Sequence, residues 1–230
     1  MSHSTFPPKR ILLTGFEPFD GEKINPSWEA VKLLEGELLI DDAGLSYQID
    51  TRQLACVFKL ALTELYQAMN ELCPAVTLCV GQAGGRGELS LERIGINIDD
   101  ARIADNQGNQ PIDAPIMTSG PAAYFSNLPI KAMTQAINAQ GIAASISNTA
   151  GTFVCNHTFY GLMHYLATEP KHALGRGGFM HIPYLPEQVS NNQPSSPSMP
   201  LADMVKGIRL ALMQAINLQR DIHVTAGREF

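Results

Sequence analysis

Two hydrophobic patterns alternate along the chain, and each indicates a different kind of element. Apolar residues spaced three or four positions apart are typical of helices with one buried face, whereas compact or alternating apolar runs are typical of strands. Because the two patterns alternate, they predict an α/β fold with a mostly parallel sheet and helices on both of its faces. The predicted strands are residues 10–14, 45–54, 75–80, 89–99, 142–147 and 177–183, of which 89–99 could instead be one arm of a hairpin. The predicted helices are residues 25–34, 57–72, 128–140, 155–168 and 200–218.

Four segments show neither pattern. Residues 1–9 are polar and predicted to be flexible, and residues 220–230 are predicted to be a C-terminal tail. Residues 187–200 are rich in Ser, Asn and Pro, which predicts a long surface loop. Residues 100–111 are rich in turn formers, so we expect an ordered loop that covers a site. A chain of 230 residues is long enough for one sizeable core, and we expect a single domain, 1–230.

Composition and charge narrow the class of protein. The chain is 45% hydrophobic and 17% charged, which is typical of an ordinary globular protein. Its net charge is −6 and its Lys and Arg residues are scattered, which argues against a nucleic-acid partner. No stretch resembles the apolar core of a secretory signal or approaches the roughly 18 apolar residues of a membrane span. We therefore expect a cytoplasmic protein with no membrane partner.

The cysteines indicate free thiols. Cys56, Cys73, Cys79 and Cys155 form no Cys-x-x-Cys pair, which favours a reducing compartment. The first three fall in or beside predicted core elements, and we interpret them as structural. No His or Cys pair has the short spacing of zinc ligands, so we expect neither a metal nor a cofactor.

Cys155 has a different setting. It lies where the strand 142–147, after a turn at Gly151, passes into a helix, and its neighbours Asn156 and His157 are polar. The unpaired N–H groups and partial positive charge of a helix start favour a thiolate, which is the nucleophilic form of cysteine. The alternative is a buried cysteine that only fills space. The polar neighbours of Cys155 favour its interpretation as a nucleophile.

A nucleophilic thiol needs a base, and the base usually needs a third group that holds its ring. Of the six histidines, His181 ends an apolar strand that can lie beside the strand preceding Cys155, so both would meet at one edge of the sheet. Its alternative role is that of a hydrogen-bonded residue at a strand end. His157 is closer in sequence, but it should point to another face of the helix. The candidate acids Glu17, Glu92, Asp99, Asp100 and Asp105 remain open, and an exposed ion pair with Arg93 is the alternative for Glu92.

Two loops could contact a ligand. The glycine-rich segment 81–87 lacks the spacing of a phosphate-binding loop, and it favours a turn that lets the backbone and Gln82 approach a small molecule. Phe16 and Phe19 follow the first strand, at the end where α/β sheets bind ligands, although they could simply pack under their loop. Phosphoryl or glycosyl transfer at the glycine-rich turn and a non-catalytic binding role remain as alternative functions.

Seven motifs occur in order between residues 10 and 218. They are Gly15-Phe-Glu-Pro-Phe, Asn25-Pro-Ser-Trp-Glu, Gly81-Gln-Ala-Gly-Gly-Arg, Glu92-Arg-Ile-Gly-Ile-Asn, Ala101-Arg-Ile-Ala-Asp-Asn, Thr149-Ala-Gly-Thr-Phe-Val-Cys-Asn-His and Gly178-Phe-Met-His-Ile-Pro. Together they resemble the pyrrolidone-carboxylate peptidase family, also called pyroglutamyl peptidase type I. The departures are small: Asp20 stands where many relatives have glycine, and Ala104 where many have proline.

The resemblance implies a fold, an activity and a set of residues. The fold would be a single three-layer α/β/α domain with a mostly parallel, mixed sheet, usually assembled as a homotetramer. The activity would be that of a cysteine peptidase that removes an N-terminal pyroglutamyl (5-oxoproline) residue from peptides through a thioester. By motif, Cys155 would be the nucleophile, His181 the base and acid, and Glu92 the group that orients His181. Arg102 would lie near the oxyanion, and the substrate pocket would comprise Phe16, Phe19, Gln82, Ile103, Phe153 and Val154.

Overall fold

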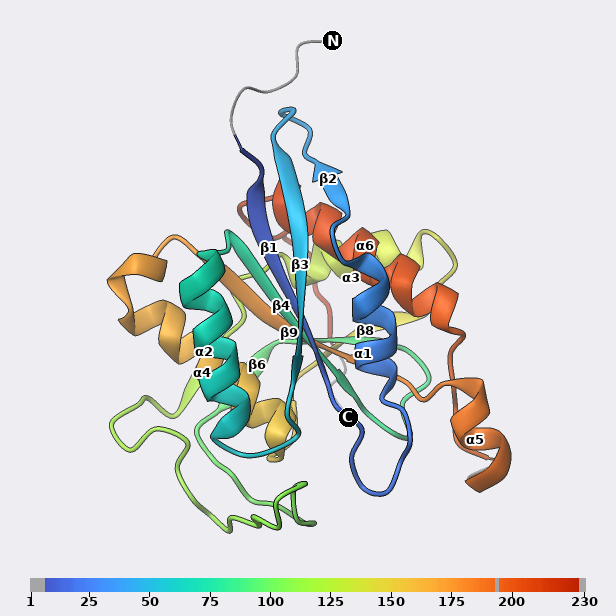
Figure 1. The fold of residues 1–230 in the computed structure, drawn as a ribbon. Coiled ribbons are helices and arrows are strands. Elements are labelled where there is room, and N and C mark those ends of the chain that lie inside the picture. The colour runs from blue at the N-terminus through green and yellow to red at the C-terminus, as the bar shows by residue number, and fades with distance from the viewer. Residues whose placement is uncertain (1–6, 193–194, 228–230) are drawn as a thin grey trace.

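A seven-stranded mixed sheet runs through the middle of the molecule (Figure 1). The structure is a computed structural model that describes residues 7–192 and 195–227. In sheet order the strands are β2 (Leu38–Ile40), β3 (Ser46–Leu54), β1 (Lys9–Phe16), β4 (Val76–Gln82), β9 (Arg176–Ile182), β5 (Leu89–Glu92) and β8 (Ala144–Ser147). The pairs β3/β1, β1/β4, β4/β9 and β5/β8 are parallel, whereas β2/β3 and β9/β5 are antiparallel. A separate antiparallel pair is formed by β6 (Ile94–Ile96) and β7 (Ala123–Phe125).

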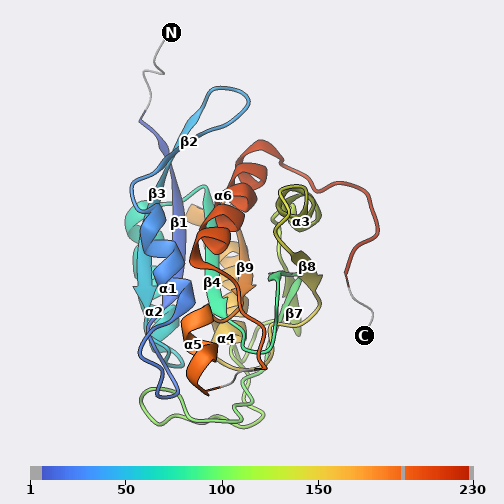
Figure 2. The same ribbon diagram turned by 90° about the vertical axis from the view of Figure 1, so that its right-hand side faces the viewer.

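Helices cover both faces of the sheet. One apolar cluster joins the sheet to α1 (Pro26–Val31), α3 (Ile130–Asn138) and α6 (Leu201–Asn217), and α3 packs against α6 (Figure 2). A second cluster joins the opposite face to α2 (Leu60–Leu72) and α4 (Val154–Thr168), which pack against each other. The predicted three-layer α/β fold with a mostly parallel, mixed sheet is therefore confirmed.

The first β-to-α connection shows how the sequence fixes local structure. The Asn25 side chain accepts a hydrogen bond from Ser27 N and so caps α1, while Pro26 occupies the first helical position, where a missing N–H costs nothing. The helix start passes so close to β1 that a Cβ on Gly15 would lie 2.7 Å from the backbone of Ser27. Only glycine fits there, and the loop that carries Phe19 is thereby held against the end of β1.

Some predicted boundaries are wrong. The predicted loop 187–200 contains a helix, α5 (Pro186–Asn192), in which Gln188 is buried. Lys9 belongs to β1 and not to a flexible start, whereas residues 1–6 lie outside the described residues. The short strands β2 and β7 were not predicted, and α2 begins at Leu60 instead of residue 57.

The predicted C-terminal tail, 220–230, has no regular structure as far as it is described, and residues 228–230 lie outside that part. It is nevertheless attached to the domain. The Asp221 carboxylate accepts hydrogen bonds from the N–H groups of Lys131 and Ala132 at the start of α3. The short helices that complete the chain are η1 (Lys32–Leu34) and η2 (Pro170–His172). Within the described ranges, no helix is both long enough and apolar enough to cross a membrane.

Candidate active site

Cys155 is the second residue of α4, and its sulfur lies beneath the end of β4. A Cβ on Gly81 would come within 2.8 Å of the Cys155 Sγ, so glycine is what allows the thiol to approach the strand. The route to this position differs from the prediction, because β5 separates β8 from β9 and the strand preceding Cys155 is no neighbour of the strand that carries His181. The connection 148–153, with Gly151 at φ +78°, instead leads the chain from β8 back to α4 on the face of β4 and β9.

The surroundings of Cys155 favour the neutral thiol over the thiolate. Burial raises the pKa of Cys155 well above its ordinary value, Cys56 and Glu92 act in the same direction, and the Arg86 guanidinium opposes them. These surroundings oppose the thiolate that the helix start is predicted to favour. A helix start contributes only about 0.3–1 kcal/mol towards a nearby negative charge, which is less than the cost of removing water from a thiolate.

His181 and Glu92 form a buried pair. The Nδ1 of His181 lies 2.7 Å from Oε1 of Glu92, whose side chain is fully buried. Arg86 reaches the same oxygen from the other side, with its Nη1 also at 2.7 Å. Burial acts to raise the pKa of Glu92, but the hydrogen bond and charge of His181, helped by Arg86, outweigh it and leave that pKa below its ordinary value. The alternative partner Arg93 instead donates to the carbonyl of Ala226.

Three of the other candidate acids have structural partners of their own. Asp99 binds Nδ1 of His157 at 2.8 Å, and Asp105 accepts hydrogen bonds from Phe58 N and from the turn that follows it. Glu17 accepts from Cys56 N and from the Asn106 side chain. Among the described residues, Glu92 is thus the carboxylate recorded in contact with His181.

His157 belongs to a second buried pair of a histidine and a carboxylate, which it forms with Asp99. Its Nδ1 faces Asp99, and its Nε2 accepts the backbone N–H of Lys59 at 2.9 Å. Its ring also meets Phe58 edge-on, and Phe58 in turn contacts Phe153 in the same manner. Both nitrogens of His157 are therefore occupied, and this pair ties the segment before α2 to the start of α4.

Cys155 and His181 line one small cavity, of about 140 Å³, which we name the inner cavity. Its walls carry three phenylalanine rings, those of Phe16, Phe19 and Phe153. The remaining lining residues are Asn25, Cys56, Gln82 and Ala150. The inner cavity is thus an apolar slot that ends at a thiol and an imidazole, with the amide of Gln82 on its wall.

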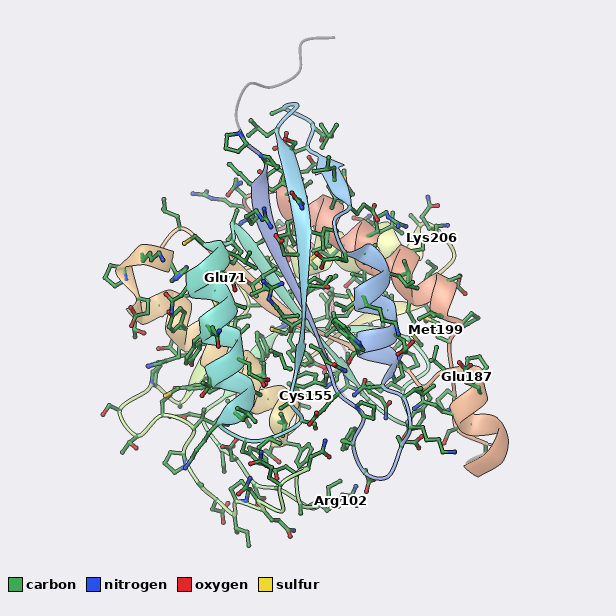
Figure 3. The ribbon with its side chains drawn as sticks, viewed as in Figure 1. Glu71, Arg102, Cys155, Glu187, Met199 and Lys206 are labelled. Atoms are coloured by element: carbon green, nitrogen blue, oxygen red, sulfur yellow. The ribbon has the colours of Figure 1, made fainter. Side chains whose placement is uncertain are left out.

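A larger outer cavity of about 540 Å³ adjoins it and shares Phe19, Gln82 and Phe153. Arg102 and Ile103, from the loop 100–111, line the outer cavity and not the inner one. In Figure 3, Cys155 lies near the end of the sheet where the loops gather, and Arg102 lies farther out on the loop below it. Val154 lines neither cavity, because its side chain is fully buried in the core around α4.

Two further features bear on ligands. A further cavity, of about 620 Å³, lies over β5 and β8 and is lined by neither Cys155 nor His181. Within residues 7–192 and 195–227, no three His, Cys, Asp or Glu side chains gather as metal ligands would. The chemistry available at the inner cavity is that of a thiol, an imidazole and a buried carboxylate.

Comparison with known proteins places this chain in a family. The family model described as pyroglutamyl peptidase matches residues 9–218. The chain is 54% identical to the pyrrolidone-carboxylate peptidase of Cupriavidus taiwanensis over 218 residues, covering 95% of this chain and 98% of the relative. It is 53% identical to that of Brevibacillus brevis over 220 residues, covering 96% and 99%. The chain belongs to the pyroglutamyl peptidase family.

Comparison with solved structures supports the same family. The crystal structure of pyroglutamyl peptidase I from Bacillus amyloliquefaciens superposes with a TM-score of 0.88 at 45% identity, covering 95% of this chain and 100% of the other. A mutant pyrrolidone carboxyl peptidase from Pyrococcus furiosus gives 0.83 at 39% identity, covering 90% and 98%. The family predicted from the seven motifs is confirmed, and with it the prediction that this member of the pyroglutamyl peptidase family is a peptidase.

Sequence reasoning misses several residues in and around the candidate site. The sequence shows Arg86 only as part of a glycine-rich motif, although it lies in the short connection between β4 and β5, six residues before Glu92. Cys56 was interpreted as structural, but it lines the inner cavity. Cys73 was assigned to the core, but it is exposed and caps α2 in the left-handed region at φ +46°. Gln188, which was placed in a loop, contacts Gln82.

Proposed function

We propose that this protein removes N-terminal pyroglutamyl residues from peptides, with Cys155 as nucleophile, His181 as base and acid, and Glu92 as the group that orients His181. The observation that carries the proposal is the inner cavity, where a thiol and a carboxylate-bound imidazole end a small slot lined by phenylalanines. The names of the relatives, which are pyrrolidone-carboxylate peptidases, support the same substrate class.

The raised pKa of Cys155 favours a reaction that begins from a thiol. Because Cys155 rests as a thiol, His181 takes its proton through Nε2 as the sulfur attacks the pyroglutamyl carbonyl carbon. In the neutral form of the ring, Glu92 holds the proton of His181 on Nδ1, so Nε2 is free to accept. The imidazolium that forms is then stabilised by the buried carboxylate.

The tetrahedral intermediate places a negative charge on the former carbonyl oxygen. None of the side chains that the structure describes caps α4, so the N–H groups of its first turn are available to that oxyanion, and Arg102 adds positive charge from the outer cavity. The C–N bond breaks, and the imidazolium gives its proton to the departing amine. Water, deprotonated by His181, then attacks the thioester and releases pyroglutamate, and the proton returns to Cys155.

The inner cavity suits a ring without a charged amine. A pyroglutamyl residue is a lactam, so a peptide that carries it offers no α-amino group for a carboxylate to bind. The faces of Phe16, Phe19 and Phe153 can enclose its methylene groups, and the amide of Gln82 can pair with the lactam. Proline lacks the ring carbonyl, and its complex would leave a polar group of the site unpaired, which can lower kcat/KM by about a thousandfold or more.

Hydrolysis of an L-pyroglutamyl fluorogenic amide tests the proposal, run beside the prolyl amide and beside Cys155→Ala. We expect the wild-type protein to cleave the pyroglutamyl amide and not the prolyl amide, and Cys155→Ala to be inactive while folded. Equal cleavage of both amides, or full activity of the variant, would refute the assignment of substrate or nucleophile. Phosphate-dependent turnover that survives thiol alkylation would instead support a transferase.

The family resemblance also supports a cytoplasmic homotetramer that acts on N-terminally pyroglutamylated peptides. The side chains of Leu38 and Ile40 on the edge strand β2 are 60% and 61% exposed, and Leu33 and Leu45 beside them are exposed as well. Such an apolar edge favours association between copies of the chain. Light scattering on the purified protein gives the oligomeric state directly.

A further inference from the structure

Gln82 is the amide of the inner cavity that is free to bind a substrate. The other lining amide, Asn25, donates to the carbonyl of Glu17 and accepts from Ser27, so it is committed to the cap of α1. Gln82 ends β4, one residue after the position opposite His181, and borders both cavities. For its side chain, the described residues provide one hydrogen bond, in which its Oε1 accepts from Gln188. The Nε2 of Gln82 therefore keeps its donors for a ligand.

The backbone N–H of Leu185 determines the orientation of the Gln82 side-chain amide. The N–H of Leu185 can only donate, and it donates to Oε1 of Gln188 at 2.9 Å. Gln188 must then present its Nε2, which lies 3.1 Å from Gln82 and donates to Oε1 of that residue. Gln188 is only 7% exposed, so water does not readily take the place of these bonds. The direction of donation is thus passed from Leu185 through Gln188 to Gln82.

This order decides which atom of the substrate Gln82 can recognise. A pyroglutamyl ring has one acceptor, its lactam C=O, and one donor, its lactam N–H. An amide that presents N–H groups pairs with the carbonyl and cannot pair with the N–H. We propose that Gln188 is a positioning residue that orients Gln82 as the hydrogen-bond donor to the lactam carbonyl, and so sets the preference for pyroglutamyl over prolyl substrates. The proposal rests on the proposed function of the inner cavity.

The Gln188→Glu variant reverses the donor order with almost no change of shape. One carboxylate oxygen still accepts from Leu185, but the other can only accept, so Gln82 must turn its Nε2 towards Glu and its Oε1 towards the cavity. That oxygen would face the lactam carbonyl. We expect kcat/KM for the pyroglutamyl amide to fall about tenfold to a hundredfold, which corresponds to about 1.4–2.8 kcal/mol, and to fall mainly through KM.

Two variants separate this effect from a loss of structure. Gln188→Met removes the donor without reversing it, so Gln82 can still turn its Nε2 to the substrate, and the loss should be smaller than in Gln188→Glu. Gln140→Glu makes the same chemical change at an exposed position outside both cavities and should match the wild type. The rate of iodoacetamide alkylation, measured on the peptide that contains Cys155, reports whether the site is intact and needs no substrate.

The outcomes distinguish a failure of the proposed role of Gln188 from a failure of the proposed peptidase function. A higher KM in Gln188→Glu than in Gln188→Met, with unchanged alkylation of Cys155, supports the orientation of Gln82. A wild-type KM in Gln188→Glu overturns it, and so does an equal loss in both variants accompanied by slower alkylation, which would make Gln188 a support of the fold only. If the wild-type protein itself does not cleave pyroglutamyl amides, the proposed function fails instead. Calorimetric binding of pyroglutamate to Cys155→Ala, with and without Gln188→Glu, then tests the orientation by itself.

Discussion

At the scale of single residues, the electrostatics of the site depend on Glu92. It is fully buried, and one of its oxygens meets both His181 and Arg86 at 2.7 Å. A buried carboxylate without a counter-charge would take up a proton, and it could then donate to Nδ1 of His181. The ring would be forced into the tautomer that carries its proton on Nε2 and cannot accept one from Cys155. The charge of Arg86 therefore protects the tautomer that the reaction needs.

The Arg86→Gln substitution tests this dependence. Without the guanidinium, the Glu92 carboxylate loses a charge partner, and we expect kcat to fall about tenfold to a hundredfold with little change in KM. Arg86→Lys keeps the charge but loses the second hydrogen bond, to the carbonyl of Thr149. Its kcat should lie between those of the wild type and Arg86→Gln. Arg93→Gln is the matched control, because Arg93 binds Ala226 outside both cavities. Wild-type kcat in Arg86→Gln would contradict the role of the ion pair.

The pH dependence of stability tests the charge on Glu92. Its pKa in the folded protein lies below the ordinary value of 4.5, so its ionised form stabilises the fold at neutral pH. This contribution is present above that ordinary value and is lost as the pH falls through the lower, folded-state pKa. We expect the free energy of unfolding in urea to fall more steeply below about pH 5 for the wild type than for Glu92→Gln. Parallel pH profiles for the two proteins would show that Glu92 is not held as a carboxylate.

At the scale of elements, the site depends on the contact between the end of β4 and the start of α4. The hydrogen of Gly81 faces the sulfur of Cys155 at a distance that leaves no room for a methyl group, and Phe179 closes the same space. The two elements are also held together by packing around Phe159 and Phe179, whose rings lie 6.0 Å apart. The position of the thiol is therefore set by the backbone and not by a flexible loop.

Gly81→Ala should disturb this contact. A Cβ at 2.8 Å from Sγ and 2.9 Å from Phe179 forces the thiol or the ring to move, and we expect slower hydrolysis and slower alkylation of Cys155. The effect on activity should be about a hundredfold, because small displacements of a reacting atom are costly. Gly87→Ala is the control, since its Cβ would meet only Pro197, at 3.1 Å, away from both cavities. Unchanged rates in Gly81→Ala would mean that the contact is looser than described.

Local patterns predicted the long elements but not the short ones. Strands such as β1 and β4 and the helix α6 are predictable because burial imposes a recognisable apolar pattern on many consecutive residues: a compact run in the strands and a helical spacing in α6. The strand β2 has only three residues, and its pairing with β3 comes from contacts that a local window does not contain. The helix α5 was hidden by Ser, Asn and Pro, yet burial of Gln188 stabilises it. The start of α2 is delayed by Lys59 at φ +64°, whose N–H is held by His157.

At the scale of the whole molecule, the sequence indicated Cys155 and His181 for a reason that was partly wrong. Their strands were expected to be neighbours, but β5 lies between them, because the order of strands depends on pairings between distant segments. Insertion of β5 is also what brings Glu92 beside His181, with Glu92 opposite Phe179 in the antiparallel register. Only the family motifs singled out Glu92 from five acids. Neither the hydrophobic pattern nor the motifs indicated the ion pair of Arg86 with Glu92 or the hydrogen bond of Gln188 with Gln82. Both contacts form between side chains that only the folded structure brings together.

The most direct test of the account is whether a pyroglutamyl group becomes attached to Cys155 during turnover. The wild-type protein would be mixed with a pyroglutamyl ester that has a good leaving group, quenched in acid within the first turnovers, digested and analysed by mass spectrometry. The account predicts the mass of a pyroglutamyl group on the peptide that contains Cys155, and no such mass in Cys155→Ala. An acyl group on another residue, or hydrolysis at full rate in Cys155→Ala, would contradict it.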